Sequence, residues 1–388
     1  MKKNNEEKTI SYKKSIFVIL ITVFFLLSCV ALVNAVVDPY FHYHKPFTNY
    51  RLIEERYVND GISRQFDYNA VIIGNSLSQN FKTTQYDELF GVKSVKLPYS
   101  GAGVKELWTA LGRIVGRNEL SDNIKDYMMT DPKFELKDYG KTKAYRNDIK
   151  EVIVVLDMED VMRSYSWHRY NDYPEYLYDD NPFNDVGYLL NKETLYRGSF
   201  YNIGMTLKGS ANTTFDEYSA WERQSGPREA CEGLSKIKKE TTDTKSLSDR
   251  DRDRVFRNIA CNIIPVIRAA EDTEFRLIIP PVSIAKWAAY HQAGETGYMI
   301  EGMRFAVSQL AAEENADIYS FMDEYDLITD LTHYCDDIHY DASVNEWMLE
   351  EIKNDHHEVT SDSYETYFDE LAEFYGNYDY TILNEYIE

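Results

Sequence analysis

The sequence predicts an α/β fold, because short apolar runs alternate with longer stretches of helical periodicity after Asp38. Several of these runs are almost continuously apolar, which is typical of parallel strands that are covered on both faces. The chain has 388 residues, enough to bury a large core in one domain that carries an insertion. A charge-free run near the amino terminus adds a separate element, a predicted membrane-spanning helix.

The amino-terminal apolar run extends from Ser15 to Val37 and is long enough to cross a bilayer. Five Lys lie within residues 1–14, and no Lys or Arg follows until Lys45, so the positive-inside rule predicts a cytoplasmic amino terminus and an extracytoplasmic main domain. A cleaved signal peptide is the alternative, because Val33–Ala35 resembles a cleavage site, but the run is longer than a usual signal core. We therefore expect a single-pass protein of the cell membrane, with residues 38–56 as a juxtamembrane segment.

Five short apolar segments predict the strands of the sheet. They are rich in branched and aromatic residues, and they lie at 70–74, 94–98, 151–157, 275–280 and 316–321. Amphipathic segments between them predict helices, which lie at 104–115, 254–270 and 298–314. These elements place one main domain over residues 57–354.

Two regions depart from the alternation of strand and helix. Residues 163–252 are rich in Tyr, Asp, Asn and Gly and then in Lys, Thr and Asp, which predicts an insertion over the sheet with a flexible segment near Lys236–Arg252. The aromatic residues of Ser164–Asp180 suit stacking on sugar rings, and packing at an interface explains them equally well. The tail, 355–388, is acidic and rich in Tyr and has room for one short helix.

Composition restricts the partners and cofactors. A formal net charge of −23 argues against a nucleic-acid partner, because phosphate backbones are held by clustered Lys and Arg. Of the four cysteines, Cys29 lies in the apolar run, and Cys231 and Cys261 could pair in an oxidising compartment, although their spacing does not require it. No zinc-ligand spacing appears, and we expect neither a metal nor an organic cofactor.

The stretch Val71–Phe81 leads from the first predicted strand into a Gly-Asn-Ser turn. Ligands of open parallel sheets bind beyond the carboxyl ends of the strands, which is where Ser76 lies. A serine nucleophile needs a base and a carboxylate that orients the base, and Asp336 precedes His339 by three residues. The alternative is an ordinary loop-to-helix junction capped by Asn75 or Ser76, beside an Asp-x-x-His pair that arose by chance in an acidic chain.

This arrangement resembles the SGNH or GDSL hydrolase superfamily over roughly residues 57–354. Gly74–Ser76 matches the family's Gly-x-Ser block after the first strand, and Asp336–His339 matches its late Asp-x-x-His block. The resemblance implies a flavodoxin-like three-layer sandwich with a mostly parallel sheet. It also implies a nucleophilic Ser76, with His339 as the base that Asp336 orients.

The resemblance further implies an oxyanion hole, and here the sequence departs from the family. The backbone N–H groups of Ser76 and Gly101 would bind the oxyanion, with Gly103 as a neighbouring candidate. The family usually supplies an Asn after the third strand, where this chain has Asp157. An ionised Asp157 would repel the oxyanion, and the loss of one donor costs on the order of a hundredfold in rate. A third donor is therefore missing or lies elsewhere.

A membrane-tethered domain of this kind resembles bacterial O-acyltransferases and acylesterases of cell-surface polymers, which often work beside a membrane-bound O-acyltransferase. The resemblance implies serine-dependent transfer or hydrolysis of acyl esters on a cell-surface carbohydrate or wall polymer. The alternative, suggested by the missing Asn, is a catalytically weak module that binds or assembles envelope polymers. A peptidase is a third interpretation, because an acyl-serine site can in principle cleave amides.

Overall fold

The structure is a computed structural model that describes residues 2–117, 121, 124–126, 141–170, 173–179, 181–238 and 245–387. The chain folds into two compact units. Unit 1 consists of Met1–Phe66 and Tyr173–Thr213, and unit 2 of Asp67–Asp172 and Thr214–Glu388. The middle of the predicted insertion thus belongs with the amino-terminal region, and the acidic tail belongs with the sheet.

Unit 2 is built on a five-stranded, all-parallel sheet with the strand order β2-β1-β3-β4-β5. Its strands are β1 (Ala70–Gly74), β2 (Ser94–Pro98), β3 (Glu151–Val155), β4 (Glu274–Ile279) and β5 (Ala316–Ser320). Every residue of β1 and β2 is buried, as expected for strands covered on both faces. The α/β class and the five predicted strands are confirmed, with strand ends shifted by at most about two residues.

Helices occupy the connections between the strands. α4 (Val104–Val115) has the predicted bounds, and α13 (Thr296–Leu310) begins and ends a little earlier than predicted. The single helix predicted over 254–270 is instead α10 (Asp249–Asn258), a π-helical segment η4 (Ile259–Ile263) and α11 (Ile264–Ile267). Pro265 explains the interruption, because it has no N–H to donate to the preceding turn.

The predicted flexible segment Lys236–Arg252 is corrected at its end. Residues 239–244 lie outside the described residues, but Asp249–Arg252 form the first turn of α10. Ser248 caps this turn, since its hydroxyl accepts a hydrogen bond from the Asp251 N–H while the Asp251 carboxylate accepts from the Ser248 N–H. A capping box therefore explains why a charged, apparently loop-like stretch is helical.

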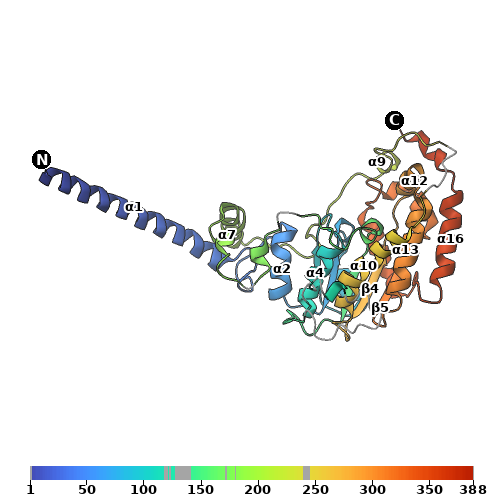
Figure 1. Cartoon of the computed structure of the whole chain (residues 1–388), viewed down its shortest axis with the longest axis horizontal. Helices are drawn as coiled ribbons and strands as arrows, with labels where there is room; N and C mark the ends of the chain where they lie inside the picture. The colour runs from blue at the N-terminus through green and yellow to red at the C-terminus, as the bar shows by residue number, and fades with distance from the viewer. Residues whose placement is uncertain are drawn as a thin grey trace. The chain divides into compact units, whose positions relative to one another are not determined.

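The acidic tail completes the core of unit 2. It forms α16 (Tyr364–Asn377) and the short η6 (Tyr380–Glu385), and α16 packs along α13 (Figure 1). Tyr375 of α16 stacks on Trp287 of α12 (Ile284–Ala293) with ring centroids 3.8 Å apart, and both rings are fully buried. The tail is thus more ordered than its composition predicts, because a buried aromatic face outweighs its acidic residues.

Unit 1 carries the membrane-length helix. Within α1 (Lys2–Val37), residues Tyr12–Val37 are long and apolar enough to cross a membrane. The other helices of the unit are α2 (Glu55–Gln65), the 3₁₀ helix η2 (Glu175–Leu177), α7 (Val186–Leu189), the π-helical η3 (Thr194–Ser199) and α8 (Phe200–Lys208). Asp38 ends α1 with a positive φ of 47° and accepts hydrogen bonds from the N–H groups of His42, Tyr43 and His44.

Candidate active site

The Gly-Asn-Ser turn joins β1 to a short 3₁₀ helix, η1 (Ser76–Ser78). Asn75 caps η1, because its Oδ1 accepts a hydrogen bond from the Leu77 N–H at 3.0 Å. Gly74 leaves no room for a side chain, since a Cβ there would lie 2.8 Å from the Cβ of Ser78. Of the two possible caps, Asn75 and Ser76, Asn75 is the one that caps η1. The Ser76 hydroxyl is directed to another partner.

That partner is His339. The Ser76 Oγ lies 2.6 Å from the His339 Nε2, and the His339 Nδ1 lies 2.7 Å from Oδ2 and 2.9 Å from Oδ1 of Asp336. An ionised carboxylate only accepts hydrogen bonds, so Nδ1 carries the ring proton and Nε2 accepts from the Ser76 hydroxyl. The structure brings the three predicted catalytic residues together in the order that lets a base remove the serine proton.

The Asp336 carboxylate is held in place by its own loop. Its Oδ1 accepts hydrogen bonds from the backbone N–H groups of Ile338 at 3.0 Å and of His339 at 2.7 Å. Burial opposes ionisation of Asp336, but these bonds and the one from the imidazole outweigh burial and lower the pKa of the carboxyl. The carboxylate therefore stays ionised at neutral pH and orients His339.

A closed loop before α15 (Ala342–Lys353) brings Asp336 and His339 face to face. The Cys335 N–H donates to the His339 carbonyl at 2.7 Å, which closes the loop, and Asp341 caps α15 through the Ser343 N–H. Asn345 of α15 donates to the Leu77 carbonyl of η1 at 3.1 Å. These contacts hold the His–Asp loop against the turn that carries the serine.

The two expected oxyanion donors follow β1 and β2, whose carboxyl ends lie at the same edge of the sheet. β1 pairs with β2 so that Gly74 lies beside Pro98, and the loop after β2 contains Gly101 with a positive φ of 67°. Gly103 is less suitable, because its N–H already donates to the Glu106 carboxylate at 2.9 Å. In the part of the chain that the structure describes, the N–H groups of Ser76 and Gly101 donate no hydrogen bond.

Asp157 follows β3, and its carboxylate approaches Asn75. The Asn75 Nδ2 donates to Asp157 at 3.0 Å and lies 3.5 Å from Asp160. Desolvation and the charge of Glu159 raise the pKa of Asp157, and burial and the charge of Asp157 raise the pKa of Asp160 to about 8. This cluster favours a protonated carboxyl, which weakens the repulsion that an ionised Asp157 was expected to exert on an oxyanion.

Two residues that the sequence analysis did not single out contact the candidate catalytic residues His339 and Asp336. The Trp221 ring lies edge-on to the His339 ring with centroids 5.6 Å apart, and the Arg223 guanidinium lies 3.6 Å from the Asp336 carboxylate. Both come from residues 214–226, where the predicted insertion returns to unit 2. No sequence motif marks Trp221 or Arg223. The one available signal was that they lie in an insertion that was expected to cover the sheet.

Lys96 connects this segment to the sheet. Its ammonium group is fully buried on β2 and donates to the carbonyl groups of Gln79 at 2.5 Å, Phe81 at 3.1 Å and Asp216 at 3.3 Å. A buried ammonium group needs such partners. Lys96 therefore joins the chain after η1 to the start of the segment that carries Trp221.

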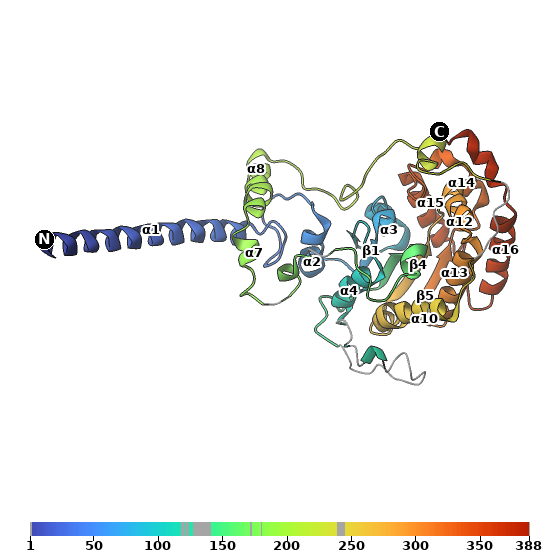
Figure 2. The same cartoon turned by 45° about the horizontal axis from the view of Figure 1, so that its top comes forward.

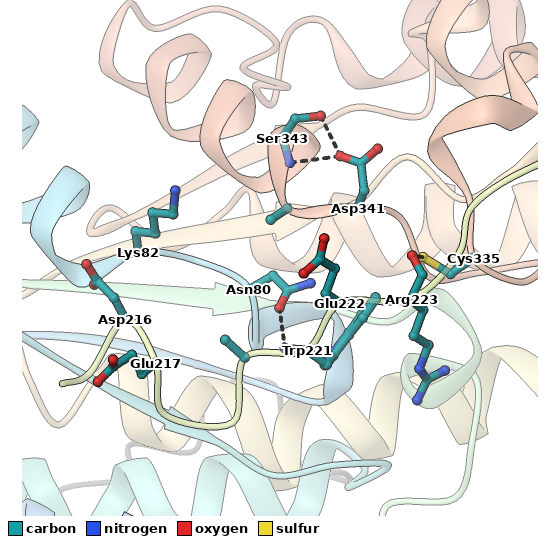
Figure 3. Close-up of a pocket in the computed structure, with 12 residues that line it drawn as sticks. Asn80, Lys82, Asp216, Glu217, Trp221, Glu222, Arg223, Cys335, Asp341 and Ser343 are labelled. Atoms are coloured by element: carbon teal, nitrogen blue, oxygen red, sulfur yellow. Dashed lines mark hydrogen bonds between the residues drawn. The ribbon is translucent and has the colours of Figure 1, made fainter. Parts of the chain in front are cut away.

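A pocket of about 570 Å³ lies beside Trp221 and Arg223 (Figure 3). Asn80 lines it and is 5 % exposed; its Oδ1 accepts a hydrogen bond from the Trp221 N–H, while its Nδ2 has no hydrogen-bond partner among the residues described. Lys82 is paired with Glu346 outside the pocket lining, whereas the exposed Glu222 forms no ion pair in the described chain. The pocket thus presents an amide donor, an aromatic ring and the carboxylates of Asp216, Glu217, Glu222 and Asp341.

The structure also bears on metal ligands and on disulfide bonds. In the described ranges, no group of three or more His, Cys, Asp or Glu side chains could hold a metal ion. Cys29, Cys231, Cys261 and Cys335 are all free, so the pairing that the spacing of Cys231 and Cys261 left open is not formed here.

No family model, curated protein or solved structure matches this chain. Its class is therefore defined by its own fold and geometry. It is an α/β protein with an all-parallel sheet, and Ser76, His339 and Asp336 are arranged as a hydrogen-bonded triad beyond the carboxyl end of β1.

Proposed function

We propose that this protein is a membrane-anchored serine acyl-transfer enzyme, an O-acyltransferase or acylesterase of the SGNH type. The observation that carries the proposal is the hydrogen-bonded series from Asp336 through His339 to Ser76, with contacts of 2.7 and 2.6 Å. The finer fold assignment, a flavodoxin-like three-layer sandwich, belongs to the same proposal. The apolar length of α1 supports a membrane anchor. The five Lys before the apolar run support the proposed extracytoplasmic location of unit 2.

In the proposed reaction, the Ser76 Oγ attacks the acyl carbonyl of a donor ester and transfers its proton to the His339 Nε2. The N–H groups of Ser76 and Gly101 stabilise the oxyanion. Collapse of this intermediate breaks the ester bond, and the leaving alcohol takes the proton from His339. An acceptor hydroxyl, or water, then attacks the acyl-serine with His339 again as base, and Ser76 recovers its proton.

The pocket beside Trp221 supports a hydroxylated acceptor such as a cell-surface carbohydrate or wall polymer. An aromatic ring stacks on the apolar face of a sugar, the Asn80 Nδ2 can donate to a hydroxyl oxygen, and Glu222 can accept from a hydroxyl. Both nearby cations already face carboxylates, Lys82 that of Glu346 and Arg223 that of Asp336. Because the carboxylates of Asp216, Glu217, Glu222 and Asp341 also line the pocket, the site disfavours an anionic ligand group. A membrane-bound O-acyltransferase is the proposed source of the acyl group.

Arg169 is our candidate for the missing third oxyanion donor. A Cβ at Gly101 would lie 3.7 Å from the Arg169 Nε, so the guanidinium lies beside the proposed donor loop. The side chain is exposed and forms no ion pair within the described ranges. A cation at this position would offset part of the charge that develops on the attacked oxygen.

The test is peptide mass spectrometry of the full-length protein in detergent after treatment with a serine-directed fluorophosphonate. An activated nucleophile gives one adduct, on Ser76, that is lost in Ser76→Ala, His339→Ala and heat-unfolded protein. Circular dichroism of both variants controls for folding. Equal labelling of wild type and a folded His339→Ala variant would reject the mechanism.

A second candidate function is a catalytically weak module that binds or assembles envelope polymers. Asp157 at the position of the family's Asn favours it. This function predicts that wall polysaccharide binds equally well to Ser76→Ala, with no fluorophosphonate adduct on the folded wild type. An isothermal titration of both proteins with purified polysaccharide separates the two functions.

A further inference from the structure

Unit 1 presents an apolar stripe that the acyl-transfer proposal does not use. η3 continues directly into α8, and four apolar side chains recur along these helices at spacings of three or four residues: Tyr196, Phe200, Ile203 and Leu207. Tyr196 is 65 %, Phe200 47 % and Leu207 83 % exposed, and Ile203 between them is half-buried. The rings of Tyr196 and Phe200 contact each other with centroids 5.6 Å apart, which places them on one face. A stripe of this spacing usually packs into a core, and here it faces outward.

The stripe is tied to the end of the membrane-length helix. Asn34 lies inside the apolar run and is fully buried; its Nδ2 donates to the Leu189 carbonyl at 2.9 Å, and its Oδ1 accepts from the Ser199 hydroxyl at 2.8 Å. Gly198 allows a close approach, because a Cβ there would lie 2.7 Å from the Pro39 ring. Asn34 is three residues, or about 4.5 Å, from the end of the run at Val37. A bilayer crossed by α1 would therefore end near the level of α8.

The orientation and charge of the segment agree with a lipid contact. Figure 2 shows α8 beside the end of α1, with its axis lying across that of α1. In a chain with a net charge of −23, the exposed charges of residues 181–210 are mainly basic, namely Lys192, Arg197 and Lys208 against Glu193. Basic side chains beside aromatic and apolar ones are typical of helices that lie at the headgroup level.

We propose that this apolar stripe lies in the bilayer interface and makes α8 a second membrane contact beside α1. The occupant is phospholipid, because the stripe is continuous with the end of an apolar helix and its basic neighbours match phosphate headgroups. The two contacts together would hold unit 1 against the membrane surface. The inference rests on insertion of α1 and not on acyl transfer, so either proposal can fail without the other.

The test uses full-length protein in nanodiscs that contain a phospholipid with a diazirine near the glycerol backbone. After irradiation, peptide mass spectrometry should find lipid adducts on residues 196–207 as well as at the end of α1. Phe200→Ser with Leu207→Ser should lower labelling of this peptide several-fold. Tyr201→Ser is the matched control, because Tyr201 is 43 % exposed beside Phe200 but packs under the Arg51 guanidinium and lies off the stripe.

Three results would overturn the inference. The first is labelling of α1 with no adduct on residues 196–207. The second is equal labelling of wild type and the Phe200→Ser, Leu207→Ser variant, with circular dichroism showing both folded. The third is protection of the stripe by protein. A photoreactive amino acid placed at position 207 would then form adducts with a second copy of the chain in nanodiscs, or with another membrane protein in native membranes, instead of with lipid.

Discussion

Three carboxyl groups are linked to the Gly-Asn-Ser turn, Asp336 through His339 and the pair Asp157 and Asp160 through Asn75, and the pair behaves in the opposite way to Asp336. The Asp336 carboxylate accepts hydrogen bonds from two backbone N–H groups and from the imidazole N–H, and its pKa is lowered despite burial. In contrast, Asp157 and Asp160 approach one amide, that of Asn75, and their pKa values are raised. The same residue type is thus ionised where donors outnumber acidic neighbours and favours its neutral form where acidic neighbours prevail.

The difference in pKa matches a difference in role: Asp336 orients His339, whereas Asp157 and Asp160 support the turn that carries Ser76. In the proposed mechanism, the general base His339 needs a permanently charged partner, and Asp336 would provide it through its own loop. The turn that carries Ser76 needs a partner for the Asn75 amide, and a pair of carboxyls that retains a proton supplies one without placing two negative charges beside the nucleophile. Four substitutions test this contrast.

The largest effect is expected from Asp336→Asn. Loss of the charge that orients His339 should lower the hydrolysis rate of p-nitrophenyl acetate about ten-thousand-fold, with the fold intact. Asp337→Asn is the matched control, because Asp337 is adjacent in sequence and forms its ion pair with Lys286, at 3.5 Å, instead of with His339. Similar rates for Asp336→Asn and wild type would remove Asp336 from the mechanism.

Asn75→Ala should destabilise the folded protein by roughly 1–3 kcal/mol, because it removes a donor shared by two carboxyls and the cap of η1. Thermal unfolding in detergent measures the change. Asn377→Ala, on the exposed part of α16, should leave the midpoint unaltered. An unaltered midpoint for Asn75→Ala would show that the Asn75 amide does not stabilise the carboxyl groups of Asp157 and Asp160.

Asp160→Asn should alter how stability depends on pH. The pKa of Asp160 is raised to about 8 in the folded protein, so between about pH 4 and pH 8 the folded state binds more protons than the unfolded state at this group. Its stabilising contribution is present below pH 4 and declines as pH rises toward 8. Unfolding free energies from pH 5 to 8 should therefore fall less steeply in the variant, by at most about 1.4 kcal/mol per pH unit.

The control for this slope is Asp253→Asn, an exposed carboxylate paired with Arg257 on α10. It should keep the wild-type pH dependence. A slope in Asp160→Asn as steep as that of wild type would mean that Asp160 is ionised throughout this range.

Arg223→Ala should have the smallest effect. Its guanidinium lies 3.6 Å from Asp336 but is 56 % exposed, and exposed ion pairs contribute roughly 0–1 kcal/mol. We expect at most a several-fold fall in kcat/KM for p-nitrophenyl acetate, with Arg228→Ala unchanged. A loss as large as that of Asp336→Asn would show that Arg223, and not the loop N–H groups, keeps the carboxylate in place.

Local pattern predicted the elements whose apolar residues form a continuous run or a regular stripe. The five strands and α4 were recognisable because an unbroken apolar run or a helical stripe is visible within a few residues. The π-helical break before Pro265 and the first turn of α10 were missed, although Pro265 and the Ser248–Asp251 capping box are themselves local signals. Trp221 could not be found this way, because its contact with His339 joins segments far apart in the chain.

The sequence by itself determined where the strands lie, that one helix has membrane-spanning length, and that Ser76, Asp336 and His339 are available in a plausible order. Only the tertiary structure decided the 2.6 Å contact between Ser76 and His339, the opposite pKa shifts of Asp336 and Asp160, and the outward direction of the apolar stripe on α8. Periodicity and length are local properties of a chain. Distances, desolvation and exposure depend on neighbours that only folding brings together.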